Sequence, residues 1–312
     1  ACPDRPWCTH PTSPALPTVR VARDQFGNFN LDYDPERPPR VALDTNAILG
    51  LGESGAQALQ RLKNECGFKF RYSILNFIEL ASHLADPPSA KSPDPFRKYQ
   101  VAFQQLHQLF QGVLPSAESV LMEGAGLKEH TGPKWIVDGG SIAYQVKLIA
   151  SAKTLPELRQ AGIDPAHYKK LREIDGTSFL GLIAEARKMI KDPLQDAGPG
   201  GQFLKRFQGF LIFRASSGTI RAETLSKEQQ LRIIAFFDEA GGKMCLSHLL
   251  KLVIKAIQDG AKDDANDFYD MLQLLLLRDT NLLFVTDDRV YFQYYVSADH
   301  HRVVPWKGFK NC

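Results

Sequence analysis

Acidic residues follow two predicted strands of the chain at the point where each strand ends. Asp44 comes directly after the apolar run 41–43, and Asp287 and Asp288 come just after the apolar run 281–285. Short apolar runs of this kind predict buried strands. Open α/β sheets bind their ligands at the edge where the carboxyl ends of parallel strands meet. A turn explains Asp44 equally well, because Asp commonly opens turns after strands.

A second group of acids falls on a predicted helix over residues 264–278. Asp267 and Asp270 share one face of that helix, beside its apolar stripe. Like charges at this spacing repel, so they are tolerated where water surrounds them or where a cation lies between them. The helix dipole favours acids in a first turn, which explains Asp264 but not Asp270, nearly two turns into the helix.

Glu79 lies on the polar face of a helix predicted over 74–84, and Ser73 is placed to cap that helix. Taken alone, Glu79 is an ordinary surface residue. Taken with the acids at the strand ends and on the later helix, it completes a set that one crevice could hold. Carboxylates supplemented by water are the ligands that Mg²⁺ and Mn²⁺ prefer. The sequence therefore predicts a site for one or two such ions.

The order of strand, helix, strand and helix near the start of the chain predicts a parallel α/β sheet. Strands are expected at 41–43, 68–72, 281–285 and 301–304, on either side of a long helical middle. Besides the two helices named above, helical patterns cover 56–65, 96–111, 116–123, 141–152, 165–191, 202–213, 226–240 and 244–258. Residues 1–39 contain eight prolines, which helices and sheet interiors exclude. They are expected to form an extended arm.

The composition is that of an ordinary globular chain, with 312 residues, 44% of them hydrophobic and 23% charged. No apolar run is long enough to predict a membrane span, and the chain does not start with a secretory signal pattern. Five widely spaced cysteines favour a reducing, cytoplasmic location over a disulfide framework. Cys2, Cys8 and His10 offer three metal ligands, although a structural zinc takes four. The net charge of +3 does not by itself indicate nucleic-acid binding.

Taken in order, these motifs resemble the PIN domain, a metal-dependent nuclease fold. The resemblance covers roughly residues 40–84 and 260–307. It rests on four short motifs in their strand and helix contexts, namely Asp44-Thr45-Asn46, Ser73 with Glu79-Leu80, Asn266-Asp267-x-x-Asp270 and Val285-Thr286-Asp287-Asp288.

The resemblance implies a role for each acid by its position. Asp44 and Glu79 would be the first two metal-binding acids, Asp270 the third and Asp288 the fourth. Asp267, one turn before Asp270, is a further catalytic acid that competes for the third place. Asp287 competes with Asp288 for the fourth.

Three further residues would support this set if the resemblance holds. Thr286 would be a supporting hydroxyl, and Ser73 would support the helix that carries Glu79. Asn46 would help to position the first acid or the scissile phosphate.

The chain departs from the family in its length, because 187 residues separate Glu79 from Asp267. We therefore expect three parts. Residues 1–39 form the Pro-rich arm, 40–84 and 244–312 form a PIN-like three-layer α/β/α nuclease domain with a central parallel sheet, and 85–243 form a mostly α-helical insertion.

The insertion carries the basic residues expected of a substrate surface. Between Lys147 and Arg214 there are twelve basic and seven acidic residues, a surplus of +5. Basic side chains neutralise phosphates, and exposed aromatics stack on unpaired bases. The aromatics in this stretch are Tyr168, Phe203, Phe207 and Phe210, and the helical spacing of the phenylalanines favours a core role for them instead. The predicted nucleic-acid contacts are Lys205, Arg206, Lys169 and Lys170.

The resemblance implies a metal-dependent endoribonuclease that cleaves single-stranded or structured RNA. Carboxylate-bound Mg²⁺ or Mn²⁺ would activate water and leave a 5′-phosphate and a 3′-hydroxyl. RNA is favoured over DNA as the partner because of the usual substrates of the fold. The alternatives are a DNA structure-specific nuclease, a non-catalytic PIN module that binds nucleic acid, and a phosphatase-like hydrolase.

Overall fold

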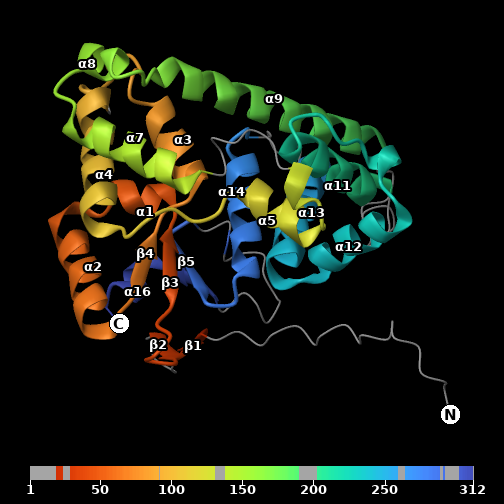
Figure 1. Cartoon of the computed structure of the whole chain (residues 1–312), viewed down its shortest axis with the longest axis horizontal. Coiled ribbons are helices and arrows are strands. Elements are labelled where there is room, and N and C mark those ends of the chain that lie inside the picture. The colour runs from red at the N-terminus through yellow and green to blue at the C-terminus, as the bar shows by residue number, and fades with distance from the viewer. Residues whose placement is uncertain are drawn as a thin grey trace.

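Four strands form a parallel sheet at the centre of the fold, in the order β4-β3-β5-β6 (Figure 1). They are β3 (Arg40–Leu43), β4 (Lys69–Arg71), β5 (Leu282–Thr286) and β6 (Val303–Pro305). The computed structural model describes residues 19–23, 29–90, 92–130, 138–189, 202–258, 264–288, 291 and 302–311. The mixed α/β class with a central parallel sheet is confirmed, and the three-layer PIN-like arrangement stays a prediction.

The pairing of β3 with β5 joins the two ends of the chain. Leu43 lies opposite Val285 in the parallel register, and the backbone N–H of Asp44 donates to the carbonyl of Val285 at 2.8 Å. Every residue of β5 is buried, as expected of a strand in the middle of a parallel sheet. The two apolar runs singled out in the sequence are therefore neighbours, and the residues that follow them lie at one edge.

The helices beside the sheet begin earlier than the sequence indicates. A short helix, α1 (Thr45–Leu49), follows β3 directly and was not expected. The next helix, α2 (Gly52–Cys66), begins four residues before the expected position 56. Gly52 has a φ of +55°, so glycine allows the chain to turn between these two helices. The helix α3 (Ile74–Ser82) matches its prediction closely.

The expectation of a purely extended arm over residues 1–39 needs correction. Residues 19–23 and 29–33 form a two-stranded antiparallel sheet, β1 (Val19–Arg23) and β2 (Phe29–Tyr33). Both segments lack proline, so their backbone N–H groups can pair. Val19 and Val21 are buried against the body. Cys2, Cys8 and His10, the three ligands considered for zinc, lie outside the described residues.

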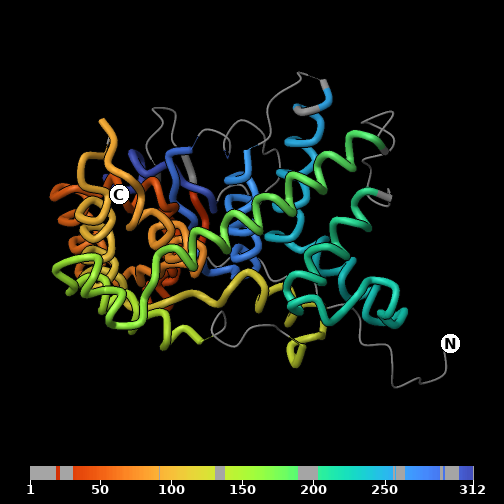
Figure 2. The backbone as a smooth tube through the Cα atoms, turned by 90° about the horizontal axis from the view of Figure 1, so that it is seen from above, coloured from red at the N-terminus to blue at the C-terminus, as the bar shows by residue number. Residues whose placement is uncertain are grey.

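Helices fill the middle of the chain, close to where their periodicity predicts them, and only the short α8 was not expected. They are α4 (Pro95–Leu109), α5 (Ala117–Gly124), α7 (Gly139–Ser151), α8 (Leu155–Gln160), α9 (Pro165–Met189), α11 (Gln202–Ala215) and α12 (Lys227–Asp238), with the short 3₁₀ turns η1 (Lys128–His130) and η2 (Ala222–Thr224). The long α9 runs from the helices beside α3 to those around α11 and packs on α3, α11, α13 and α14 (Figures 1 and 2).

Gly241 and Gly242 do not separate two helices, as their sequence suggested. The helix α13 (Ala240–Gln258) begins before them and contains both. A Cβ on Gly241 would lie 2.7 Å from the backbone nitrogen of Arg278, and one on Gly242 would lie 2.4 Å from the carbonyl oxygen of Phe236. These glycines therefore allow the close approach of backbones rather than a turn.

The helix predicted over 264–278 is shorter and divided. The α-helix α14 (Asp267–Gln273) is followed by the 3₁₀ turn η3 (Leu274–Arg278). The four leucines 274–277 are all buried, because α5, α13 and β5 pack around this turn. The last helix, α16 (Trp306–Phe309), packs on β5 and β6.

Buried apolar side chains from both predicted parts, 40–84 with 244–312 and 85–243, belong to one contiguous core. The division into a nuclease domain and an insertion stays a prediction. Within the described ranges, every helix is too short or too polar to cross a membrane. Cys66 and Cys245 are free thiols.

Candidate active site: carboxylates at the edge of the sheet

Asp44 is held at the carboxyl end of β3 by two neighbours. Its Oδ1 accepts from the backbone N–H of Thr45 at 2.7 Å and caps α1. Its Oδ2 accepts from Thr286 Oγ1 at 3.1 Å, across the pairing of β3 with β5. Only 3% of Asp44 is exposed. The residue is therefore both the turn residue and the carboxylate at the sheet edge, the two interpretations that its sequence allowed.

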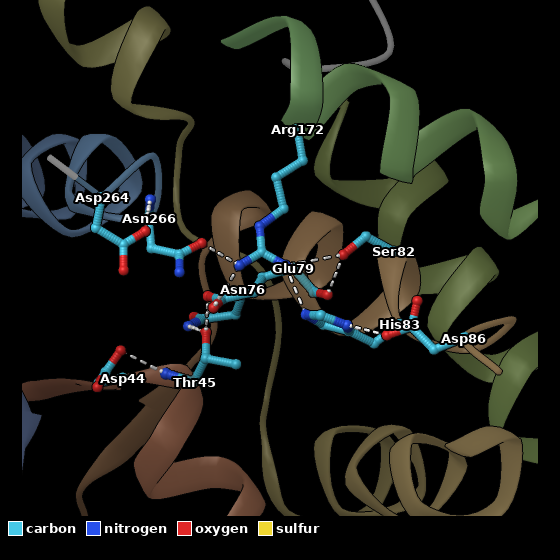
Figure 3. Close-up of polar contacts among 10 residues, drawn as sticks. All are labelled: Asp44, Thr45, Asn76, Glu79, Ser82, His83, Asp86, Arg172, Asp264 and Asn266. Atoms are coloured by element: carbon cyan, nitrogen blue, oxygen red, sulfur yellow. Dashed lines mark hydrogen bonds and ion pairs between the residues drawn. The ribbon is translucent and has the colours of Figure 1, made fainter. Parts of the chain in front are cut away.

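Glu79 is oriented by a chain of hydrogen bonds that starts at the cap of α3. Ser73 and Asn76 form a capping box at the start of this helix. Asn76 Nδ2 donates to Thr45 Oγ1 at 3.0 Å, and Thr45 Oγ1 donates to Glu79 Oε2 at 2.7 Å (Figure 3). Thr45 and Asn76 are buried. Buried networks with every member bonded fix side-chain positions, so Glu79 is placed by α1 and α3 together.

The segment after β5 approaches the same place through Thr286. Besides donating to Asp44, Thr286 Oγ1 accepts from the backbone N–H of Asp288 at 3.0 Å. Asp287 is exposed, and its Oδ1 accepts from the backbone N–H of Lys307 at 3.3 Å. Asp288, unlike Asp287, contributes to the raised pKa values of the other acids. Of the two adjacent acids, Asp288 belongs to the cluster.

The carboxyl of Asp270 on α14 is affected by the charges of several neighbouring acids. Burial, followed by the charges of Asp44, Glu79 and Asp288, holds the pKa of Asp270 well above its usual range. Within the described part of the chain, nothing donates a hydrogen bond to this carboxyl group. A partly buried acid that is near other acids and receives no hydrogen bond is destabilised when ionised.

The pKa values of two more acids in this cluster are raised. Burial and the charge of Glu79 raise the pKa of Asp44 from 3.8 to about 7, against the hydrogen bonds from Thr45 and Thr286. Burial and the charge of Asp264 raise the pKa of Asp267 from 3.8 to about 6. The charges of Asp44 and Glu79 are among the largest causes of the raised pKa of Asp270, whereas Asp264 is the largest charged cause for Asp267.

Asn46 is exposed on α1. The structure holds Asp44 through Thr45 and Thr286 instead, and the role predicted for Asn46 toward a phosphate stays a prediction. Thr45 and Asn76 are supporting residues for which no role was predicted from the sequence. Their positions in the sequence could have indicated this role, since Thr45 follows the first acid and Asn76 shares the polar face of α3 with Glu79.

Arg172 of α9 is the functional candidate that sequence reasoning did not single out among the basic residues. Its Nη2 lies 3.6 Å from Glu79 Oε1, and Nη1 donates to Ser82 Oγ at 3.3 Å. The same guanidinium also hydrogen-bonds to His83 Nε2 and Asn266 Oδ1 (Figure 3). No feature of the sequence indicates this contact, because it depends on how α9 packs across α3.

The four predicted nucleic-acid contacts are all exposed. Lys169 Nζ lies 2.8 Å from Asp86 Oδ1, and Arg206 Nη1 lies 3.6 Å from Glu185 Oε2. Tyr168, Phe203 and Phe207 are buried, and Phe210 packs partly buried against the core. The core interpretation of these aromatics is therefore confirmed, and stacking of bases on the three buried rings is excluded.

The donor chemistry of the cluster fits a hard divalent cation, because its side chains offer carboxylate oxygens. Among the residues that the structure places, no three or more His, Cys, Asp or Glu side chains lie close enough together to hold an ion as they stand. An ion would therefore have to draw carboxylates of the cluster closer together.

Comparison of this chain with protein-family models, with curated proteins and with solved structures gives no match.

Proposed function

We propose that this chain is a metal-dependent endonuclease with a PIN-like fold, and that RNA is its substrate in preference to DNA. The supporting observation is the accumulation of negative charge at the carboxyl edge of the sheet. Asp44, Glu79, Asp270 and Asp288 come from four separate segments, and their charges act on one another. Acids whose pKa values are raised by burial and by other acids cluster at functional sites more often than elsewhere.

The metal-binding acids in this proposal are Asp44, Glu79, Asp270 and Asp288. A bound Mg²⁺ or Mn²⁺ supplies an activated water and neutralises charge on the phosphate. Thr286 orients Asp44 through Oδ2, and Thr45 orients Glu79 through Oε2. These contacts fix the orientation of two carboxylates at the edge of the sheet.

Asp267 is the proposed proton acceptor. Its pKa of about 6 lies near neutral pH, in the range where a carboxylate takes up a proton most effectively. It lies one turn before Asp270 on α14, so the acceptor and a metal acid are carried by the same helix. The proposed products are a 5′-phosphate and a 3′-hydroxyl.

The proposed substrate surface is the basic face of the middle helices. Exposed Lys205 and Arg206 on α11 and Lys169 and Lys170 on α9 are its candidate phosphate contacts. Such contacts give affinity without base specificity. The preference for RNA over a DNA structure comes from the resemblance alone.

A non-catalytic PIN module that binds nucleic acid is the second candidate, and one observation favours it. Glu79 is paired with Arg172 in this structure, and a site that never loads a metal would keep such a pair.

A cleavage assay separates the candidates. The protein is incubated with end-labelled single-stranded RNA, structured RNA and matched DNA, in the presence of Mn²⁺, Mg²⁺ or EDTA. Asp44→Asn is the test variant. Asp238→Asn is the matched control, because Asp238 is an exposed acid at the end of α12. We expect cleavage that requires metal, disappears with Asp44→Asn and survives Asp238→Asn. Binding of RNA without cleavage under any condition would support the non-catalytic module. Cleavage of DNA alone would show that DNA, not RNA, is the substrate.

A further inference from the structure

Arg172 connects the middle helices to the elements that carry two of the proposed metal acids. The side chain leaves α9 and ends between α3 and the start of α14 (Figure 3). There it contacts Glu79, Ser82 and His83 from α3 and its C-cap, and Asn266 from the N-cap of α14. A guanidinium carries its charge at every working pH. A permanent cation therefore lies at the rim of the acid cluster.

Arg172 lies beside the carboxylate oxygen of Glu79 that Thr45 does not bond. Glu79 Oε2 already accepts from Thr45 at 2.7 Å, and Oε1 lies 3.6 Å from Arg172 Nη2. The side chains of Glu79 and Arg172 are 23% and 20% exposed, so water screens the pair less than it screens a surface ion pair. A divalent ion that binds Glu79 has to share or replace the charge of Arg172.

Arg172 also contacts the start of α14, through Asn266. Asn is a strong N-cap residue, and its side chain normally accepts from the backbone N–H groups of the first turn. Here Asn266 makes no such bond to α14, and its Oδ1 accepts from Arg172 instead. The guanidinium thus holds the end of α14 beside which Asp267 and Asp270 lie.

We propose that Arg172 is an internal counter-ion that competes with the divalent cation for Glu79. In the metal-free protein it balances part of the negative charge of the cluster, and it gives up Glu79 when the ion binds. The side chain of Arg172 on α9 is then paired with Glu79 in the metal-free protein and released from it in the metal-bound protein. This inference rests on the proposed metal site.

Calorimetric titration of Mn²⁺ into the intact protein tests the competition without relying on activity. The variant Arg172→Met removes the charge and keeps an unbranched side chain. The matched control is Arg159→Met, which removes a cation from an exposed pair with Asp164 (3.5 Å). We expect Arg172→Met to bind Mn²⁺ roughly three- to tenfold more tightly than the wild type, as for the removal of about 1 kcal/mol of opposing charge interaction. Arg159→Met should bind as the wild type does.

Thermal unfolding of the same proteins gives a second readout. Without metal, Arg172→Met should unfold at a lower temperature than the wild type, and Mn²⁺ should raise its midpoint by a larger amount. Arg172→Lys keeps the charge but loses the planar fork, so its unfolding temperature should lie between those of the wild type and Arg172→Met. This variant replaces Arg172→Met in the test if the Met variant does not fold.

Binding of Mn²⁺ to Arg172→Met with unchanged or weaker affinity would overturn the inference and make Arg172 a positioning residue for Glu79. That result leaves the proposed function standing. If neither the wild type nor the Arg172 variants bind Mn²⁺, both the inference and the proposed metal site are wrong.

Discussion

Two groups of ionisable side chains lie inside this protein, and they differ in how their charges are balanced. One is the acid cluster at the sheet edge. The other surrounds Arg214 of α11, whose Nε and Nη2 donate to the two carboxylate oxygens of Asp175 at 2.9 and 2.7 Å. Arg214 also pairs with Glu118 of α5, and Tyr269 of α14 donates to Asp175 at 3.1 Å.

The direction of the pKa shifts separates the two groups. At Arg214, burial opposes the charge, but Glu118 and Asp175 outweigh it and raise the pKa of the guanidinium further above its usual range, which keeps it ionised. At the sheet edge, burial and mutual repulsion raise the pKa of Asp44 and Asp270, which disfavours their ionised forms. The first group ties four helices together. The second costs stability, and the proposed cation site would account for that cost.

The comparison predicts opposite effects on stability when one charge is removed from each group. Arg214→Met should lower the free energy of unfolding by about 3–5 kcal/mol, because it leaves Glu118 and Asp175 buried without a cation. Urea denaturation measures the change. Arg232→Met, which removes an exposed i,i+4 pair with Glu228, is the control and should stay within about 0.5 kcal/mol. If Arg214→Met lowers the free energy of unfolding no more than Arg232→Met does, the Arg214 group does not stabilise the fold.

Removing an acid from the cluster should instead stabilise the protein without metal. Asp270→Asn replaces a carboxylate surrounded by acids with an amide that can donate to them. We expect the variant to be more stable than the wild type at pH 8 and to lose Mn²⁺ binding, because burial and the neighbouring acids disfavour the charged form of Asp270. The same denaturation experiment measures it. A variant less stable than the wild type at pH 8 contradicts the account of an unbalanced cluster.

The raised pKa values also predict how stability depends on pH. The folded state holds its proton on Asp44 up to about pH 7 and on Asp267 up to about pH 6, whereas both release it near pH 3.8 when the chain unfolds. Because the folded state binds more protons in this window, their contribution to stability is full below about pH 4 and is lost as the pH rises toward 7. Each group contributes a slope of at most about 1.4 kcal/mol per pH unit.

Thermal unfolding between pH 5 and 8 without metal measures this slope. Asp44→Asn should flatten it, whereas the guanidinium of Arg214 stays charged throughout the window because Glu118 and Asp175 raise its pKa. A stability that rises from pH 5 to 8, or a slope unchanged by Asp44→Asn, would contradict the raised pKa of Asp44.

A smaller effect is expected inside the network that orients Glu79. Thr45→Val removes the donor to Glu79 and the acceptor of Asn76 Nδ2, which should cost about 1 kcal/mol of stability. It should also weaken Mn²⁺ binding. Thr45→Ser keeps the hydroxyl and should restore both. If Val and Ser behave alike in the titration, the hydroxyl does not orient Glu79.

The smallest effect on folding is expected at the basic surface. The double variant Lys205→Ala, Arg206→Ala changes two exposed residues and should alter stability by less than about 0.5 kcal/mol. If both side chains contact phosphates, the plot of log affinity for RNA against log salt concentration should become shallower by about 2. Lys227→Ala, exposed on α12, is the control. An unchanged slope would place the substrate elsewhere.

The sheet and its acids could be predicted because the signals are local. The apolar runs that form β3 and β5 end at Asp44 and Thr286, and a parallel sheet brings such ends together by geometry alone. The strands β1 and β2 were missed because the surrounding prolines masked two short segments that contain none. The helix α1 was missed because five residues carry too little periodicity.

The contacts between distant elements could not be predicted. Whether Asp267 or Asp270 faces Asp44 depends on the rotation of α14, and the approach of Arg172 to Glu79 depends on the packing of α9 on α3. Neither leaves a pattern in the sequence. Arg172 and Arg214 are only two of the twelve basic residues between Lys147 and Arg214, although one reaches the acid cluster and the other is enclosed by the helices.

The acids at the sheet edge are proposed to form a cation site, and a calorimetric titration shows whether they bind Mn²⁺. Mn²⁺ is added at pH 7 to the wild type and to Asp44→Asn, in two buffers with different heats of ionisation. The account predicts that the wild type binds Mn²⁺ and releases protons, because the ion ionises Asp44 and Asp270, and that Asp44→Asn loses this binding. Absence of binding by the wild type, or equal binding by the two proteins, would contradict the claim.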